Sequence, residues 1–266
     1  MMTIQNYVRP QSLEEAYELN QKKSNRIIGG MLWLKMTSGN VSTAIDLCDL
    51  GLDTIEETKD SFSIGAMVSL RQLELHEGLN TYTLGAVTKA VQDIVGVQFR
   101  NMATIGGSIF GRFGFSDVLT VFLSMDTYVE LYKGGIVPLE EFALRERDRD
   151  ILVRIIVKKR PGTFTYLSMR NTRTDFPVLT CAASCVDGAY HVAIGARPQK
   201  AVLLKDTQGI LSGGISDETA RTFANFAAEC VPVGSNVRGS SEYRTHLTKV
   251  LTNRALLELE GMTHGN

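Results

Sequence analysis

Two glycine pairs constrain this chain more than any other feature of its sequence. They lie in IIGGMLWL (27–34) and MATIGGSIFGRFGFSD (102–117), each directly after a short apolar run. Glycine lets the backbone turn sharply and approach a ligand closely, and successive backbone N–H groups then line a concavity that holds phosphate oxygens. Two such segments, far apart in sequence, suit a ligand that carries a pyrophosphate between two bulky ends. Neither segment matches GxGxxG or GxxxxGK[ST], so the usual dinucleotide-binding fold and nucleotide hydrolysis are disfavoured.

The first part of the chain predicts helices and strands joined by glycine-rich loops. We expect Ser12 to cap a helix over 11–23 and Glu15 to complete its capping box. We expect Ser69 to cap a second helix directly after a strand. Apolar residues at helical spacing predict a further helix over 82–95, and the glycine-rich segment that follows it is expected to be a loop.

The pattern changes near Arg160–Gly162. Before this point ILVRIIVKK (151–159) alternates as a strand. After it, the residues predict three consecutive strands, with a hairpin turn at VDGAY, and then two helices, the first capped by Ser216. We therefore predict an α+β fold of two domains. They cover residues 1–160, with subdomains of about 1–53 and 54–160, and residues 161–266, a smaller α+β domain of antiparallel strands plus helices.

Composition and charge exclude several classes of protein. The formal net charge of -1 gives no electrostatic reason to expect nucleic acid or an anionic membrane as a partner. No stretch of about 18 apolar residues is present, so we expect no membrane span. The N-terminus, MMTIQNYVRPQSLEEAYEL, lacks the basic-then-apolar layout of a signal peptide. Together with the few scattered cysteines, this predicts a cytoplasmic protein.

The cysteines and histidines do not indicate a metal site. Cys181 and Cys185 would share one face of a strand, which leaves a disulfide or a metal pair open. Burial as small hydrophobic residues of a core strand is the favoured interpretation. No CxxC motif or Cys-rich run marks an iron–sulfur cluster, and the four histidines are isolated from one another.

The two glycine segments resemble those of a known family, the FAD-binding subunits of the molybdenum hydroxylases. These include the flavin subunits of xanthine dehydrogenase, carbon monoxide dehydrogenase and nicotinate dehydrogenase. The family typically carries AGGTDLL near its N-terminus and RNxATIGGNxxxxxPxSD farther along, where this chain has IGGMLWL and RNMATIGGSIFGRFGFSD. The second match includes Arg100, Asn101, Thr104 and Ser116–Asp117. DILVRIIV, GARPQKAVLLKD and RGSSEYRTHLTKVLTNRAL extend the resemblance over nearly the whole chain.

The resemblance implies a fold, a cofactor and partners. The fold would be a two-subdomain FAD-binding domain of the vanillyl-alcohol-oxidase/PCMH type, followed by the smaller C-terminal domain. The protein would be an oxidoreductase subunit without catalytic residues of its own. Substrate would be hydroxylated at the molybdenum cofactor of a large subunit. Electrons would pass through [2Fe–2S] clusters of a small subunit to FAD, and then to NAD⁺ or another acceptor.

The resemblance also implies roles for particular residues. Backbone N–H groups for the pyrophosphate would come from Ile28, Gly29, Gly30, Met31 and Leu32. The second wall, near the ribityl chain and phosphates, would consist of Ala103, Thr104, Gly106, Gly107 and Ser108. Ser116 and Asp117 would bind sugar hydroxyls, and Ile94 and Leu152 would pack on the flavin or adenine ring. Ile27, Trp33 and Phe110 complete the expected FAD site.

The chain departs from the family pattern at four places. Met31-Leu32 stands in place of Thr-Asp, and Ser108 in place of Asn. Gly114-Phe115 stands where a Pro usually precedes Ser-Asp, and Leu167 where some relatives carry a flavin-facing Lys. Backbone donors survive any change of side chain, so FAD is still expected to bind. The departures bear on its affinity and its redox potential.

Two other functions remain open at this point. A stand-alone flavin-dependent oxidoreductase of the same fold would need a substrate acid or base, and Tyr166, Arg170, Arg173 and Asp175 form the dense polar cluster of the second domain. The departures in the glycine segments suggest the other alternative, a cofactor-free assembly subunit.

Two features have two interpretations each. Trp33, the sole tryptophan, is expected either to pack in a core or to form a wall beside the cofactor. LRERDRD (144–150) is expected to be a solvated loop, with partner docking as the alternative.

Overall fold

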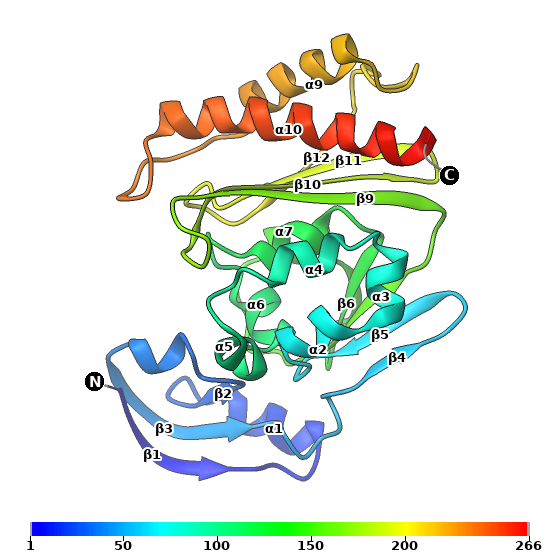
Figure 1. Cartoon of the computed structure of the whole chain (residues 1–266). Coiled ribbons are helices and arrows are strands. Elements are labelled where there is room, and N and C mark those ends of the chain that lie inside the picture. Colours follow the sequence, from blue (N-terminus) through cyan, green and yellow to red (C-terminus); the bar gives the residue numbers. More distant parts are fainter. Residues whose placement is uncertain (1, 265–266) are drawn as a thin grey trace.

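Three sheets follow one another along the molecule in chain order in this computed structural model, which describes residues 2–264 (Figure 1). The first sheet is parallel, and the other two are antiparallel. The two ends of the chain lie at opposite ends of the molecule. This mixture of helices and mainly antiparallel strands confirms the predicted α+β class.

The N-terminal unit contains the parallel sheet, in the order β1-β3-β2. Its elements are β1 (Met2–Val8), α1 (Leu13–Asn20), β2 (Arg26–Ile28), the 3-10 helix η1 (Leu34–Met36) and β3 (Gly39–Asp46). The Ser12 hydroxyl accepts a hydrogen bond from the Glu15 N–H at 3.1 Å, as predicted for the cap of α1. The Glu15 carboxylate accepts from the Gln11 N–H at 2.7 Å instead of completing a capping box with Ser12. β1 was not predicted, because its mostly exposed residues carry little apolar alternation.

The middle unit contains the five-stranded antiparallel sheet, in the order β4-β5-β8-β6-β7. Its strands are β4 (Ile55–Glu57), β5 (Ser61–Gly65), β6 (Thr127–Leu131), β7 (Gly135–Pro138) and β8 (Leu152–Lys158). Its helices are α2 (Leu70–Leu75), α3 (Glu77–Tyr82), α4 (Ala86–Val91), α5 (Val97–Met102), α6 (Ile105–Gly111), α7 (Asp117–Leu123) and α8 (Leu139–Leu144). Ser69 caps α2 in a full capping box with Gln72, as the sequence predicted for this serine.

Two expectations for the middle unit were wrong in extent. The helix predicted over 82–95 is only α4, because Leu84 and Gly85 adopt left-handed backbone angles, with φ of 51° and 78°. The segment expected to be a loop contains α5 and α6. The Thr104 side chain caps α6, so the second glycine pair lies in a first helical turn. A capping threonine provides this start even though glycine disfavours helix interiors.

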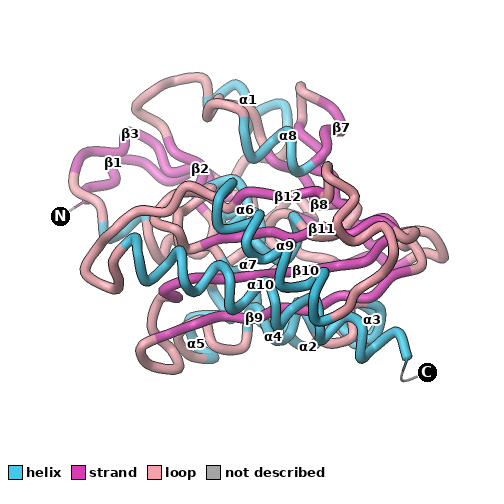
Figure 2. Tube along the Cα trace, turned by 90° about the horizontal axis from the view of Figure 1, so that it is seen from above, coloured by secondary structure: helices cyan, strands magenta, loops and turns pink. Residues whose placement is uncertain are grey.

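The C-terminal unit is a four-stranded antiparallel meander, β9 to β12, covered on one face by α9 and α10 (Figure 2). Its elements are β9 (Gly162–Arg170), β10 (Pro177–Val186), β11 (Ala189–Gly195), β12 (Val202–Lys205), α9 (Asp217–Cys230) and α10 (Ser241–His264). The predicted strands, the hairpin turn and the Ser216 cap are confirmed. The turn uses left-handed backbone at Asp187 and Gly188.

Both faces of this last sheet are covered, so β10 is buried along nearly its whole length. Cys181 and Ala183 face the helices, whereas Ala182 faces the core of the middle unit. Phe164 of β9 also belongs to that core, and its ring lies 5.1 Å from that of Tyr82. All four cysteines are free, and Cys181 is buried as a small core residue.

Candidate functional site

The first glycine pair follows β2 and packs directly against the segment before α6. A Cβ atom on Gly30 would lie 1.8 Å from the carbonyl oxygen of Met102. A Cβ atom on Gly29 would lie 2.8 Å from the Thr104 hydroxyl oxygen. Neither glycine has a positive φ; the sharp turn is made by Met31, with a φ of 58°. The glycines are therefore required for close packing, which brings two segments far apart in sequence into contact.

The loop after β2 presents a row of unused hydrogen-bond donors. Within residues 2–264, the N–H groups of residues 29–33 donate no hydrogen bond to the protein. Two residues after this row, the Lys35 N–H donates to the Met31 carbonyl at 3.0 Å. These residues are half-buried. Successive backbone N–H groups that line a concavity bind anions. Five successive half-buried donors that the protein does not use therefore offer a site for a ligand with acceptor oxygens.

The second glycine pair is built differently. The N–H groups of Gly106 and Gly107 donate to the Ala66 carbonyl at 2.9 Å and to the Thr104 hydroxyl at 3.1 Å. The Ser108 N–H donates to the Thr104 carbonyl at 3.1 Å. The expectation that both segments offer rows of N–H donors was therefore wrong for this one, because capping and the first helical turn use them. Its glycines allow close packing instead: a Cβ atom on Gly106 would lie 2.5 Å from the Ala66 carbonyl oxygen.

Two adjoining cavities lie beside these segments. The larger, of about 430 Å³, is where the N-terminal unit meets the middle unit. The smaller, of about 200 Å³, reaches the C-terminal unit. They share four lining residues, Trp33, Ala103, Ser108 and Phe113, so the two cavities adjoin.

The structure brings all the predicted FAD-site residues to these two cavities. The larger is lined by Ile27, Ile28, Gly29, Gly30, Met31, Leu32, Trp33, Ala103, Thr104, Gly106, Gly107, Ser108, Phe110 and Leu152. The smaller is lined by Ile94, Ser116 and Asp117, together with the shared residues. Ile94 and Leu152, both predicted to pack on a ring, thus lie in different cavities. The individual roles of these residues stay predictions.

Asp117 lies in a buried polar triad at the smaller cavity. Its Oδ1 atom accepts hydrogen bonds from the Tyr166 hydroxyl and from Arg170 Nη2. Burial raises the pKa of the Asp117 carboxyl to about 6, against the lowering effect of the Arg170 guanidinium. One carboxylate oxygen is thus engaged within the protein, which the sequence did not reveal. Ser116 is engaged as well, since its hydroxyl accepts from the Leu119 N–H at 3.0 Å and caps α7.

An aromatic cluster lies where the two cavities adjoin and contains residues of all three units. The ring of Trp33 lies 5.7 Å from that of Phe99, 5.1 Å from that of Phe115 and 5.2 Å from that of Phe176. Phe113 stacks on Phe115 at 5.1 Å. Trp33 packs on three rings and lines both cavities, and its role as a wall beside the cofactor stays a prediction. The phenylalanines of this cluster were not predicted, although FGF in the second glycine segment was a signal.

The charged loop 144–150 contributes part of the wall of the larger cavity. Residues 144–148 are exposed, as expected for a solvated loop. Arg147, Asp148, Arg149 and Asp150 also line the cavity, which was not predicted. Arg149 Nη2 donates to the carbonyls of Lys22 at 2.7 Å and Asn25 at 3.0 Å, which fixes the loop to the N-terminal unit. These anchors are long-range contacts, and charge patterning along the sequence does not reveal them.

Leu167 is not positioned to face the site. It packs in the core between the C-terminal sheet and its helices. Side chains alternate along a strand, so the neighbouring Tyr166 points to the opposite face, toward Asp117. The proposed equivalence of Leu167 with a flavin-facing lysine was therefore wrong.

The described residues contain neither a metal-ligand cluster nor a membrane-spanning helix. Residues 2–264 contain no group of three His, Cys, Asp or Glu side chains arranged to hold a metal ion. No helix in this part of the chain combines the length and apolar character needed to cross a membrane.

Comparison with known proteins places this geometry in a family. Residues 2–159 match the FAD binding domain in molybdopterin dehydrogenase, and residues 164–259 match the CO dehydrogenase flavoprotein C-terminal domain. The uncharacterized protein YgfM of Escherichia coli (strain K12) is 28% identical over 93% of both chains. The nicotine 6-hydroxylase medium subunit of Paenarthrobacter nicotinovorans is 25% identical, over 97% of this chain and 98% of the relative.

A solved structure shares the fold of the whole chain. It is the carbon monoxide dehydrogenase of Hydrogenophaga pseudoflava, in a form that lacks the Mo-pyranopterin moiety of the molybdenum cofactor. The TM-score is 0.88 at 21% identity, covering 97% of this chain and 98% of that one. The first family match alone spans more than half of the residues. The chain therefore belongs to the family of FAD binding domains of molybdopterin dehydrogenases, and it is an oxidoreductase subunit whose cofactor is FAD.

Proposed function

We propose that FAD lies across the two cavities, with its pyrophosphate at the loop after β2. The free N–H groups of residues 29–33 carry this proposal, because they offer acceptor oxygens a row of donors that the protein does not use. The close packing of Gly30 on Met102 holds that row at the mouth of the larger cavity. When bound, FAD supplies electron and hydride transfer, and the protein supplies binding, orientation and electrostatics.

The departures from the family pattern are compatible with this site. The donors at Met31 and Leu32 are backbone groups, so the change of side chain leaves them in place. Ser108 turns its hydroxyl inward, donating to the Thr104 carbonyl at 3.1 Å. The cofactor-free alternative does not account for the five unpaired N–H groups of residues 29–33 or for the two cavities.

We further propose that the subunit relays electrons within a larger complex. A large subunit with a molybdenum cofactor and a small subunit with [2Fe–2S] clusters would be its partners, and NAD⁺ or another acceptor would receive the electrons. Two similarities support this: one relative is a medium subunit, and the solved neighbour belongs to a molybdenum enzyme.

The geometry does not favour a stand-alone oxidoreductase. The polar cluster that such an enzyme would need is occupied internally. Tyr166 and Arg170 both bind Asp117, and Arg173 pairs with Asp93 at 2.9 Å. Asp175 pairs with Arg238 at 3.1 Å. No member of the cluster is left as a free acid or base for substrate.

The absorbance spectrum of the purified chain tests the cofactor site, followed by release and identification of any flavin. We expect flavin bands and the release of FAD. A colourless chain that takes up no added FAD would refute the site. Co-purification from the native host tests the relay: recovery of a molybdenum subunit and an iron–sulfur subunit supports it. Isolation of an active flavoprotein without them would favour the stand-alone alternative.

A further inference from the structure

A sharp turn between α4 and α5 forms one wall of the smaller cavity. It consists of residues 93–96, of which Ile94 and Val95 line the cavity. Val95 has a φ of 50°, in the left-handed region that β-branched residues rarely adopt. A residue persists in such a conformation only where the surrounding structure fixes it, and such residues cluster at functional sites.

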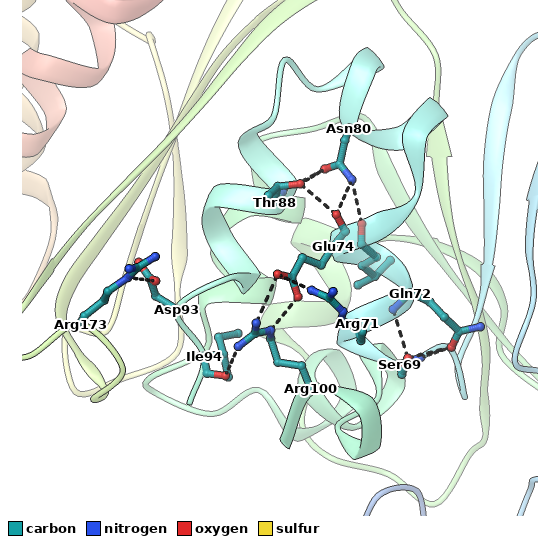
Figure 3. A network of polar contacts seen from close by, with 11 residues as sticks. Ser69, Arg71, Gln72, Glu74, Asn80, Thr88, Asp93, Ile94, Arg100 and Arg173 are labelled. Carbon is teal, nitrogen blue, oxygen red and sulfur yellow. Dashed lines mark hydrogen bonds and ion pairs between the residues drawn. The ribbon is translucent and has the colours of Figure 1, made fainter. Parts of the chain in front are cut away.

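Arg100 provides that support from the protein interior. Its Nη1 atom donates to the Ile94 carbonyl at 3.2 Å, and its side chain is only 6% exposed. Glu74 holds the guanidinium by two bonds, Nε to Oε2 at 2.8 Å and Nη2 to Oε1 at 3.2 Å. Figure 3 shows Arg100 between the Ile94 carbonyl and the Glu74 carboxylate. A two-bond Arg–carboxylate pair fixes orientation as well as charge.

The backbone of Glu74 is fixed by a network that joins three helices (Figure 3). Asn80 Nδ2 donates to the Glu74 carbonyl at 3.1 Å, and the Thr88 hydroxyl donates to the same carbonyl at 3.2 Å. The Thr88 hydroxyl also lies 2.6 Å from Asn80 Oδ1. These hydrogen bonds join the end of α2 to α3 and α4. They therefore fix the backbone of the residue that pairs with Arg100.

The other charged contacts nearby are weaker candidates for this role. Arg173 pairs with Asp93 of the same turn, but its side chain is 80% exposed, and such pairs contribute little. Arg71 also pairs with Glu74, at 2.8 Å, but it makes no contact with the turn and its side chain is 30% exposed. The buried pair is therefore the one that can hold the wall of the cavity.

We propose that Arg100 is a positioning residue of the cofactor site. It holds the Ile94–Val95 turn in its left-handed form against whichever ring of FAD occupies the smaller cavity, and Glu74 holds Arg100 in turn. This inference rests on the proposed FAD site. It gives a role to the arginine that precedes the second glycine segment and is not among the lining residues of either cavity.

The test compares Arg100→Lys with Arg71→Gln, the matched control on the same carboxylate. Lysine keeps the charge but is a point donor and cannot make both bonds to Glu74 while reaching Ile94. We expect Arg100→Lys to weaken FAD binding about tenfold, from the loss of a charge-assisted bond, and to change the visible circular dichroism of bound flavin. Arg71→Gln leaves both unchanged.

A second substitution separates positioning from general destabilisation. Glycine adopts a positive φ without steric cost, so Val95→Gly in the Arg100→Lys background should restore most of the FAD affinity and the wild-type dichroism. A loss that Val95→Gly leaves uncorrected would overturn the proposal, as would Arg100→Lys binding FAD like wild type.

The outcomes remain distinct if a variant or the site itself fails. If Arg100→Lys does not fold, Glu74→Gln is the second variant, because glutamine keeps one acceptor oxygen for Arg100. We expect it to lower FAD affinity by less than the tenfold loss expected for Arg100→Lys. Unchanged FAD affinity of Glu74→Gln overturns the inference. A wild-type chain that binds no FAD refutes the proposed function together with this inference. A wild-type chain that binds FAD, beside an Arg100→Lys chain of equal affinity, refutes the inference alone.

Discussion

Replacing Gly30 by Ala tests the contact on which the cofactor site is built. The added Cβ would lie 1.8 Å from the Met102 carbonyl oxygen and 3.2 Å from the Ala103 N atom, both backbone atoms that cannot rotate away. Overpacking lowers the free energy of unfolding by about 1–3 kcal/mol. Because the contacted atoms belong to the backbone, we expect a loss of about 3 kcal/mol for Gly30→Ala. The loop after β2 must move away from Met102, and its free N–H groups move with it. In the proposed site, loss of one charge-assisted hydrogen bond to the pyrophosphate would cost about 1.5–3 kcal/mol, or about ten- to hundredfold in FAD affinity.

Two other glycines provide the controls for this substitution. Gly213→Ala places its Cβ where no atom lies within 4 Å and should change neither property, or stabilise slightly. Gly29→Ala meets the Thr104 side chain at 2.8 Å, which can rotate, so its effect should be intermediate. Urea unfolding of the FAD-free chain and a fluorescence titration with FAD measure the two quantities. Equal stability and affinity for Gly30→Ala and Gly213→Ala would refute the close-packing argument.

Three further predictions follow from the same structure. Folding raises the pKa of Asp117 from 3.8 to about 6, so the native chain holds a proton that the unfolded chain releases, and this group's contribution to stability falls as pH rises. The unfolding free energy of wild type minus that of Asp117→Asn should therefore fall by about 2 kcal/mol between about pH 4 and pH 6. A flat difference in pH-dependent urea melts would contradict the shift. Trp33, the sole tryptophan, lines both cavities, so bound FAD should quench the tryptophan emission. Trp33→Phe should abolish this emission while FAD still binds. An unquenched spectrum with bound FAD would place the cofactor elsewhere. Arg149→Ala removes hydrogen bonds to the Lys22 and Asn25 carbonyls and should lower the free energy of unfolding in urea by about 2 kcal/mol. Arg145→Ala breaks an exposed i,i+4 pair and should lower it by at most about 0.5 kcal/mol. Equal losses would mean that the hydrogen bonds of Arg149 do not stabilise the loop more than a surface ion pair does.

The sequence predicted the local elements best where a cap and a periodic pattern agreed. Ser69 and Ser216 cap helices as expected, and the strands from β9 to β11 follow their alternation. Prediction failed where backbone conformation overrides pattern. Leu84 and Gly85 adopt left-handed angles that shorten α4, and Thr104 starts a helix within a glycine-rich stretch.

The candidate site divides in the same way. The glycine pairs and the family motif identified the residues that line both cavities, because close backbone approach leaves a mark in the sequence as glycine. They did not reveal that Asp117 binds Tyr166 and Arg170, which lie in the other predicted domain. Hydrogen-bond partners across such a distance in sequence have no fixed spacing.

The sequence by itself determined the α+β class, the FAD-binding family and the segments that meet at the two cavities. Its glycines, caps and alternating strands are local features, and their physical causes act within a few residues. Only the tertiary structure decided which of the two glycine segments keeps free N–H donors, which charged loop lines the larger cavity and which arginine contacts the turn at Val95. Each of these three features depends on contacts between residues that are far apart in the sequence. Only such contacts decide whether an N–H donor is paired and whether a turn is supported.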